Sequence, residues 1–179
     1  MLFRSPSLGK DNIERGLEAL AVGAVLTFIF LAVYYRWFGM VANVILLTNV
    51  VVLVALMSAL PGAALSLPGI AGVVLTIGMA ADANVLIFER IREELRNGNS
   101  PHAAIAAGFD KAFSAIADSN VTTLIAGIVL FAFGTGPIKG FAVTLVLGIF
   151  TSLFTAVVVS RVLIDVIWGR RRRIAKLPV

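Results

Sequence analysis

Residues 67–95 read LPGIAGVVLTIGMAADANVLIFERIREEL, and this stretch decides how the chain folds. Its first 22 residues carry only one charge, that of Asp82. They are long enough for a helix that crosses the hydrocarbon core of a bilayer, which takes about 20 residues. The next seven residues carry five charges. The abrupt change from apolar to charged sequence predicts a membrane helix that leaves the bilayer near residue 88.

The whole chain has the composition of a helical membrane protein. Of its 179 residues, 59% are hydrophobic and 14% are charged, and the mean hydropathy is +0.98. Soluble domains are about 45–50% apolar and about 25% charged, so a soluble enzyme and a disordered chain are both excluded. Long apolar runs argue against an outer-membrane barrel. The absence of cysteine and the single histidine exclude disulfides and a multi-histidine metal site.

Five apolar segments predict an all-α protein with five transmembrane helices. A lead-in at 1–16 precedes this bundle of 17–168, and a basic tail follows it at 169–179. Most connections are short, including the turn at 36–38, but the connection at 89–119 is long. The expected spans lie at 17–35, 39–60, 68–88, 120–136 and 140–168.

The long connection predicts two helices. The first continues out of the third span, with Arg90 and Glu94 as an opposite-charge pair four residues apart. Gly98 is suited to ending this helix, and Ser100 followed by Pro101 is suited to starting another. Apolar residues at helical spacing then predict an amphipathic cytoplasmic helix, on the membrane or under the bundle. The pattern leaves open whether that helix is a connector or a docking element.

The basic residues predict the orientation. Five spans place four basic residues on one side and ten on the other, with Arg161 inside the last span. The excess of positive charge puts the C-terminus in the cytoplasm and the N-terminus outside. Residues 1–16 lack the apolar core of a signal peptide, so we expect a span or signal upstream, in a larger protein. The alternative is a small protein whose helical hairpins insert by themselves.

Asp82 is the first candidate for a functional residue. An ionised aspartate in a membrane span costs at least about 2.5–3.5 kcal/mol by insertion scales. Such residues face the bundle interior or a wet cavity, and they commonly belong to ion or proton routes. The alternative is a structural aspartate held by hydroxyl groups or by an arginine.

The third span carries two faces that each predict a protein contact. Asn84 points about 200° around the helix from Asp82, so the two residues lie on different faces. Small residues spaced four apart on the Asn84 face allow close helix packing, and a span that needs protein on both faces is expected at a central position. The face of Asp82 includes Ala71, Leu75 and Gly78, and that of Asn84 includes Gly72, Thr76 and Ala80. A stripe on the fifth span fits either a water path or close packing: Thr144, Gly148, Thr151, Ser152 and Thr155.

Further polar residues fall in or near the spans. Arg161 is expected at about the depth of Asp82, and a local pair with Asp165 is favoured over a pair with Asp82 or Asp118. Asp118 is predicted as the N-cap of the fourth span. The polar start of that span continues with Asn120, Thr122 and Thr123.

Enzyme chemistry is not expected. An intramembrane aspartyl protease needs two spanning aspartates, and only Asp82 lies deep. A serine protease needs a serine and a base together in the membrane, whereas His102 lies in the cytoplasmic connection. No phosphate-binding loop is present. We therefore expect a protein without a cofactor that draws on an ion gradient.

Several stretches together resemble the SecD/SecF family of protein-export membrane subunits, within the RND superfamily. Residues 67–95 carry the resemblance, and SPSLGKDNIERGL (5–17), YYRWFGMVANV (34–44) and ADSNVTTLIAGIVLFAFGTGPIKGFAVTL (117–145) agree with it. The resemblance implies an RND-type half bundle. It also implies that the chain holds only spans two to six of a SecD-type subunit, without the first span and the periplasmic domain.

The resemblance implies a function as well. In the family, SecD and SecF form a pseudo-symmetric pair beside the SecYEG channel. They draw out preproteins driven in by SecA, using a proton or sodium gradient across the bacterial inner membrane. The ion-route aspartate of the DAN motif matches Asp82, and its arginine partner is usually on the SecF side. Other family motif positions match Asn84, Asp118, Asn120, Thr122 and Thr123.

The implied partners are SecF, SecYEG with SecA, YajC, YidC, a preprotein and membrane lipid, but not nucleic acid. The resemblance also places the N-terminus in the periplasm. Two alternatives to ion-coupled export stay open. One is half of another RND-type transporter that exports small molecules or lipids. The other is a scaffold of the translocon that transports nothing.

Overall fold

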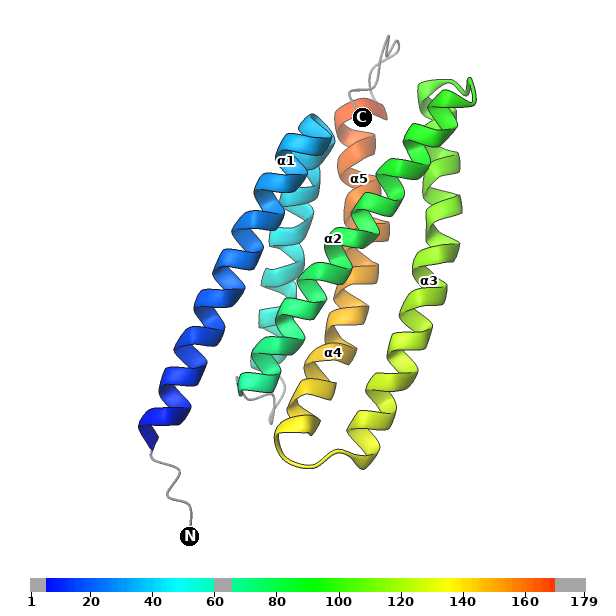
Figure 1. The fold of residues 1–179 in the computed structure, drawn as a ribbon. Helices are drawn as coiled ribbons and strands as arrows, with labels where there is room; N and C mark the ends of the chain where they lie inside the picture. Colours follow the sequence, from blue (N-terminus) through cyan, green and yellow to red (C-terminus); the bar gives the residue numbers. More distant parts are fainter. Residues whose placement is uncertain (1–5, 60–65, 170–179) are drawn as a thin grey trace.

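The computed structural model describes residues 6–59 and 66–169, which form a bundle of long helices (Figure 1). Within these ranges there is no strand. Four helical stretches among the described residues are long and apolar enough to cross a membrane, in agreement with the predicted all-α membrane fold. The elements are α1 (Pro6–Ala59), α2 (Leu67–Arg96), α3 (Pro101–Phe133), α4 (Pro137–Phe154), η1 (Thr155–Val159), α5 (Ser160–Ile164) and η2 (Asp165–Gly169), where η denotes a π-helical segment.

Helix α1 consists of two arms that meet at Arg36. This residue has φ 50° and ψ −114°, which interrupts the helix and matches the turn predicted at 36–38. The two arms run side by side in opposite directions (Figure 1). The Asn43 side-chain amide donates to the carbonyl of Phe28 over 3.1 Å. A Cβ atom on Gly39 would overlap the carbonyl of Leu31, so the arms need glycine there to approach so closely.

Helix α2 packs against α1, α3 and α4. Its contact with α4 depends on glycines that face threonines. A Cβ atom on Gly72 would lie 2.9 Å from the Cβ of Thr144, and one on Gly148 would overlap Thr76. At these positions the stripe predicted on the fifth span therefore serves close helix packing.

These contacts also fix the register of α2 against α4. Thr144 lies beside Gly72 and Gly148 lies beside Thr76, and the two helices run in the same direction (Figure 1). The same register places Phe154 level with Asp82 and Arg161 close to the level of Glu89. The expectation that Arg161 shares the depth of Asp82 is therefore wrong. At 1.5 Å per residue, Arg161 lies about 10 Å nearer the charged end of α2.

The turn between α2 and α3 confirms the sequence prediction. Asn97 caps the end of α2, and Gly98 follows with φ 88°. The Ser100 hydroxyl accepts a hydrogen bond from the backbone N–H of Ala103, and Pro101 is the first residue of α3.

Helix α3 continues without a break from Pro101 to Phe133. The prediction of a separate cytoplasmic helix at 101–119, with Asp118 as the N-cap of the next span, is therefore wrong. The polar residues here do not end the helix, because their side chains bond the preceding turn. The Asn120 amide donates to the carbonyl of Ile116 over 2.7 Å, and the Thr122 hydroxyl donates to that of Asp118.

A charged clamp joins α2 to α3 beside this turn. The Lys111 ammonium donates to the buried Glu94 carboxylate, which also accepts from Asn99. The predicted Arg90–Glu94 pair is wrong, because Arg90 bonds Glu93 instead, at 2.6 Å. Lys111 is available to Glu94 because α3 folds back along α2.

Acid should weaken this clamp. Glu94 lies beyond the apolar part of α2, and its hydrogen bond with Lys111 lowers the pKa of its carboxyl below the usual 4.5. The clamp therefore stabilises the fold above about pH 4.5, and its contribution is lost as the pH falls through the lowered value. Melting temperatures of the unmodified chain and of Glu94→Gln should converge between pH 6 and pH 3. A gap that is constant with pH would contradict this role.

Close packing of α2 and α3 should depend on Gly108. A Cβ atom there would lie 2.8 Å from the backbone nitrogen of Ile91, which cannot rotate away. Gly108→Ala should therefore lower the free energy of unfolding by about 1–3 kcal/mol. Gly78→Ala is the matched control on α2, because no atom lies within 4 Å of its Cβ position. Chemical denaturation in detergent measures both variants, and equal stabilities would contradict the prediction.

Candidate functional site

The two faces of α2 have different environments. The face of Asn84 is buried in the bundle, with Gly72, Thr76 and Ala80 along it. The face of Asp82 is exposed, with Ala71, Leu75 and Gly78 along it. The sequence predicts that protein packs against both faces. Within the described residues, other helices pack only against the face of Asn84.

Asp82 therefore points away from the bundle that this chain forms. Within the described residues its carboxylate has no hydrogen-bond or ion-pair partner. The prediction that Asp82 faces the bundle interior is wrong for this chain alone. The packed side of α2 at this level is already occupied by the buried Ala81, Ala83 and Asn84. Any group that contacts this carboxylate therefore has to approach from the outer face of α2.

Several buried polar groups inside the bundle have unused hydrogen-bonding capacity. The Asn84 amide donates to the carbonyl of Ala80 over 2.8 Å, but its side-chain oxygen has no partner among the described residues. The same holds for the side-chain oxygen of Asn49 and the hydroxyl of Ser160. Asn49 donates to the Thr155 hydroxyl over 3.2 Å, so this group links α1 to η1. Buried polar atoms are nearly always paired, so these three could each bond a water or another polar group.

The structure brings a second carboxylate to the level of Asp82. Gly108 on α3 lies against Ile91 on α2, and the two helices run in opposite directions (Figure 1). This register places Asp118 at about the same depth in the bundle as Asp82. Asp118 is also exposed, within a continuous helix. This relation is not apparent from the sequence, because Asp118 before an apolar run has the pattern of a helix cap.

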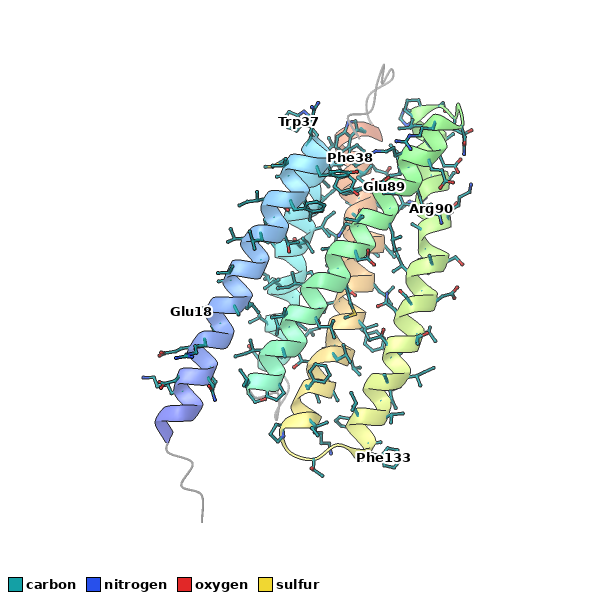
Figure 2. All side chains as sticks on the ribbon, in the orientation of Figure 1. Glu18, Trp37, Phe38, Glu89, Arg90 and Phe133 are labelled. Atoms are coloured by element: carbon teal, nitrogen blue, oxygen red, sulfur yellow. The ribbon has the colours of Figure 1, made fainter. Side chains whose placement is uncertain are left out.

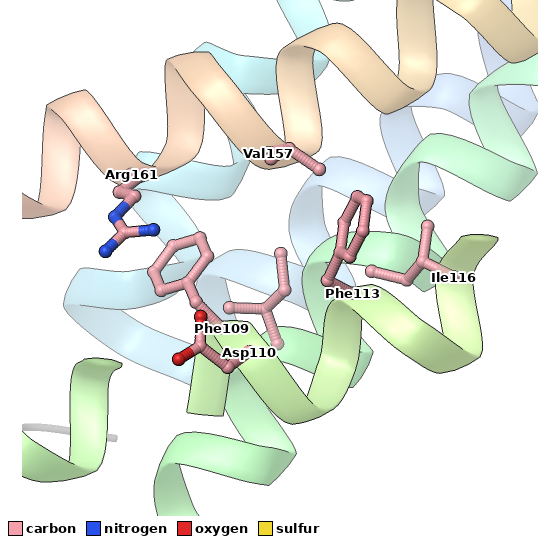
Figure 3. A pocket seen from close by; sticks show the side chains of 7 residues that line it. Phe109, Asp110, Phe113, Ile116, Val157 and Arg161 are labelled. Carbon is pink, nitrogen blue, oxygen red and sulfur yellow. The ribbon is translucent and has the colours of Figure 1, made fainter. Parts of the chain in front are cut away.

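The remaining candidate residues do not gather around Asp82. Asn120 is buried, Thr123 is half-buried, and Thr122 is exposed on α3, each bonded to its own helix. Arg161 is exposed on α5 and forms no ion pair within the described residues, so the predicted pair with Asp165 is wrong. The Arg161 side chain instead lies against a pocket bordered by α3 (Figure 3).

Aromatic and charged side chains gather at one end of the bundle. Figure 2 shows Trp37, Phe38, Glu89 and Arg90 at the end opposite to Phe133. Glu89 accepts hydrogen bonds from Tyr35, at 3.0 Å, and from Arg92, at 2.8 Å. The Phe38 ring stacks on Trp168, with centroids 4.6 Å apart. Such a mixture of aromatic and charged groups is typical of a membrane–water interface.

The fold and this site define a helical membrane protein with one apolar, carboxylate-bearing face left uncovered. Residues 2–169 match the family described as "Protein export membrane protein SecD/SecF, C-terminal". The chain belongs to this family.

Relatives agree along nearly the whole chain. It is 58% identical to protein translocase subunit SecD of Pseudomonas aeruginosa, over 93% of this chain and 27% of the relative. It is 50% identical to SecD of Escherichia coli K12, over 97% of this chain and 28% of the relative. The crystal structure of SecDF from Thermus thermophilus, a translocon-associated membrane protein, superposes with a TM-score of 0.87 at 43% identity. That match covers 92% of this chain and 23% of SecDF. The chain thus spans less than a third of these proteins.

Asp82 and Arg161 should contribute independently to stability. Their helices place them about 10 Å apart in depth, and no ion pair joins them. In a double-mutant cycle, Asp82→Asn and Arg161→Gln should be additive to within about 0.5 kcal/mol. Denaturation of the two single variants and the double variant in detergent gives the coupling energy. A coupling energy well above about 0.5 kcal/mol would show that the side chains of Asp82 and Arg161 interact directly.

Proposed function

We propose that this chain is the membrane part of a Sec translocation subunit that uses an ion gradient to assist preprotein export across the bacterial inner membrane. One observation carries the proposal: Asp82 lies on an exposed face of α2, between residues that are otherwise apolar. Membership of the SecD/SecF family supports the assignment to protein export.

The partner that covers Asp82 is a SecF-type half bundle. A carboxylate left in hydrocarbon costs several kcal/mol, so this face of α2 needs protein or a wet cavity against it. Gly78 leaves open space next to Asp82, which suits the close approach of a second helix. The solved structures named SecDF support a pairing of this kind. Arg161 does not reach Asp82, so the cationic partner of Asp82 comes from the other half.

The energy for export enters when Asp82 gains and loses a proton. A neutral carboxylic acid fits an apolar interface, whereas the carboxylate needs a cation or water. Each state thus favours a different packing of the two halves. One charge that crosses a potential of 100 mV supplies about 2.3 kcal/mol, which changes a two-state equilibrium about 50-fold. Asp118 lies at the same depth as Asp82 and offers a second carboxylate on the ion path. The coupling ion in this scheme is H⁺ or Na⁺.

In this proposal the chain crosses the membrane five times. Helix α1 supplies two crossings because its arms reverse at Arg36, and α2, α3 and the α4–η2 segment supply one each. The lead-in is then periplasmic, and the charged end with Glu89 and the basic tail are cytoplasmic. The chain carries no enzymatic activity and no cofactor. Its partners are SecF, SecYEG with SecA, YajC, YidC, and a preprotein handled by a periplasmic domain outside this chain.

A chimera tests the role of Asp82. The chain replaces the matching segment of E. coli SecD, with which it is 50% identical, in cells without their own SecD. Asp82→Asn should keep assembly with SecF but lower gradient-dependent export at least tenfold, because the amide cannot carry a proton. Asp165→Asn is the matched control, an exposed carboxylate on η2 that should leave export unchanged.

Two outcomes would overturn the proposal. Normal export by the Asp82→Asn chimera would make this domain a scaffold of the translocon. Loss of assembly with SecF in Asp82→Asn, but not in Asp165→Asn, would make Asp82 a structural residue. Export is followed by protease protection of a preprotein after SecA-driven entry, with and without an uncoupler.

A further inference from the structure

A cavity of about 270 Å³ opens between α3 and the η1–α5 segment, with one residue of α2 in its wall (Figure 3). Arg161 and Asp110 lie at one end of it, and Phe113 and Ile116 lie at the other (Figure 3). Its remaining lining comes from Ile87, Phe109 and Val157. The cavity therefore has a charged end and an apolar end.

The two charges lack partners within the described residues. Neither Arg161 nor Asp110 forms an ion pair there, and both are exposed. Both residues border the same cavity, but the guanidinium nitrogens of Arg161 lie more than 4.0 Å from the carboxylate oxygens of Asp110. A guanidinium and a carboxylate held apart in this way fit a ligand that carries both a negative and a positive group.

The charged end lies at the level of the membrane–water interface. Helix register places Asp110 and Arg161 both close to the level of Glu89, where the apolar part of α2 ends. Aromatic side chains gather at the same end of the bundle, including Tyr35 and Trp168. Phospholipid phosphates lie at this depth in a bilayer, which makes a lipid headgroup the anion within reach of Arg161.

The apolar end leads deeper, along the same two helices. A second cavity of about 310 Å³ shares Phe113 and Val157 with the first. Apart from Asn120 its lining is apolar, with Leu124 and Phe150 among the residues. Val157 lies in η1, and π-helical turns are rare and often occur at functional sites. A headgroup pocket thus continues into a groove that suits an acyl chain.

We propose that this paired cavity is a binding site for a phospholipid whose headgroup carries a primary ammonium, such as phosphatidylethanolamine. The Arg161 guanidinium donates to the phosphate, and the Asp110 carboxylate accepts from the ammonium. An acyl chain lies between Phe113 and Val157. A choline headgroup has no N–H to donate to Asp110, and a glycerol headgroup has no positive charge, so both bind more weakly. The site is separate from Asp82, which lies about 10 Å deeper in the membrane.

Native mass spectrometry of the full chain in detergent tests the site with phosphatidylethanolamine, phosphatidylcholine and phosphatidylglycerol at equal concentrations. Phosphatidylethanolamine should bind about tenfold more tightly than the other two. Asp110→Asn should remove its preference over phosphatidylcholine. Arg161→Gln should weaken all three about tenfold. Asp165→Asn and Arg96→Gln are matched controls, because both residues are exposed and neither lines either cavity.

A steric pair of variants tests the groove. Val157→Trp fills the point where the two cavities meet and should abolish tight binding. Val158→Trp is the control: Val158 is 46% exposed and lines neither cavity. This variant should bind phosphatidylethanolamine as tightly as the unmodified chain does. Circular dichroism checks that both variants keep their helical content.

Three results would overturn the proposal. The first is unchanged phosphatidylethanolamine affinity in both Asp110→Asn and Arg161→Gln. The second is full competition by phosphoethanolamine without acyl chains, which would show a site for a soluble headgroup alone. The third is a photocrosslinker at Val157 that captures a protein and no lipid in membranes, which would show that a partner helix fills the groove.

Discussion

The close packing of one face of α2 is the constraint on which the arrangement of this domain depends. Helix α2 has one face packed so closely that glycines at 72, 108 and 148 are needed where it meets α3 and α4. That packing leaves the other face, with Asp82, outside the bundle. A carboxylate on an apolar helix needs protein or a wet cavity against it, and in the function proposed above that cover comes from a second half bundle.

The bundle also separates its polar groups by depth. Asp82 and Asp118 lie at one level, within the apolar part of the helices. Arg161 and Asp110 lie at another, near Glu89, where tyrosine, tryptophan and charged side chains gather. The two levels call for different chemistry. In the proposals above, the two carboxylates at the deeper level belong to the ion path, and the two charges at the interface hold a lipid headgroup.

Much of this could be predicted from local sequence. Gly98, Ser100 and Pro101 set the turn between α2 and α3 through backbone preferences that act within a few residues. Long apolar runs predicted the membrane helices, and the single charge among residues 67–88 drew attention to Asp82. These features depend on residues that are neighbours in the sequence, so they can be predicted without knowledge of the fold.

The errors share another physical origin, namely contacts between distant segments. The depth of Arg161 does not follow from its neighbours in sequence, because register depends on glycine–threonine contacts between α2 and α4. The partner of Glu94 does not follow either, because Lys111 reaches it only when α3 folds back. Asp118 resembles a cap in sequence, yet it lies within a helix whose hydroxyl and amide groups bond the preceding turn. In an apolar bundle, polar residues report that a contact is needed, but the packing of small residues decides which contact is made.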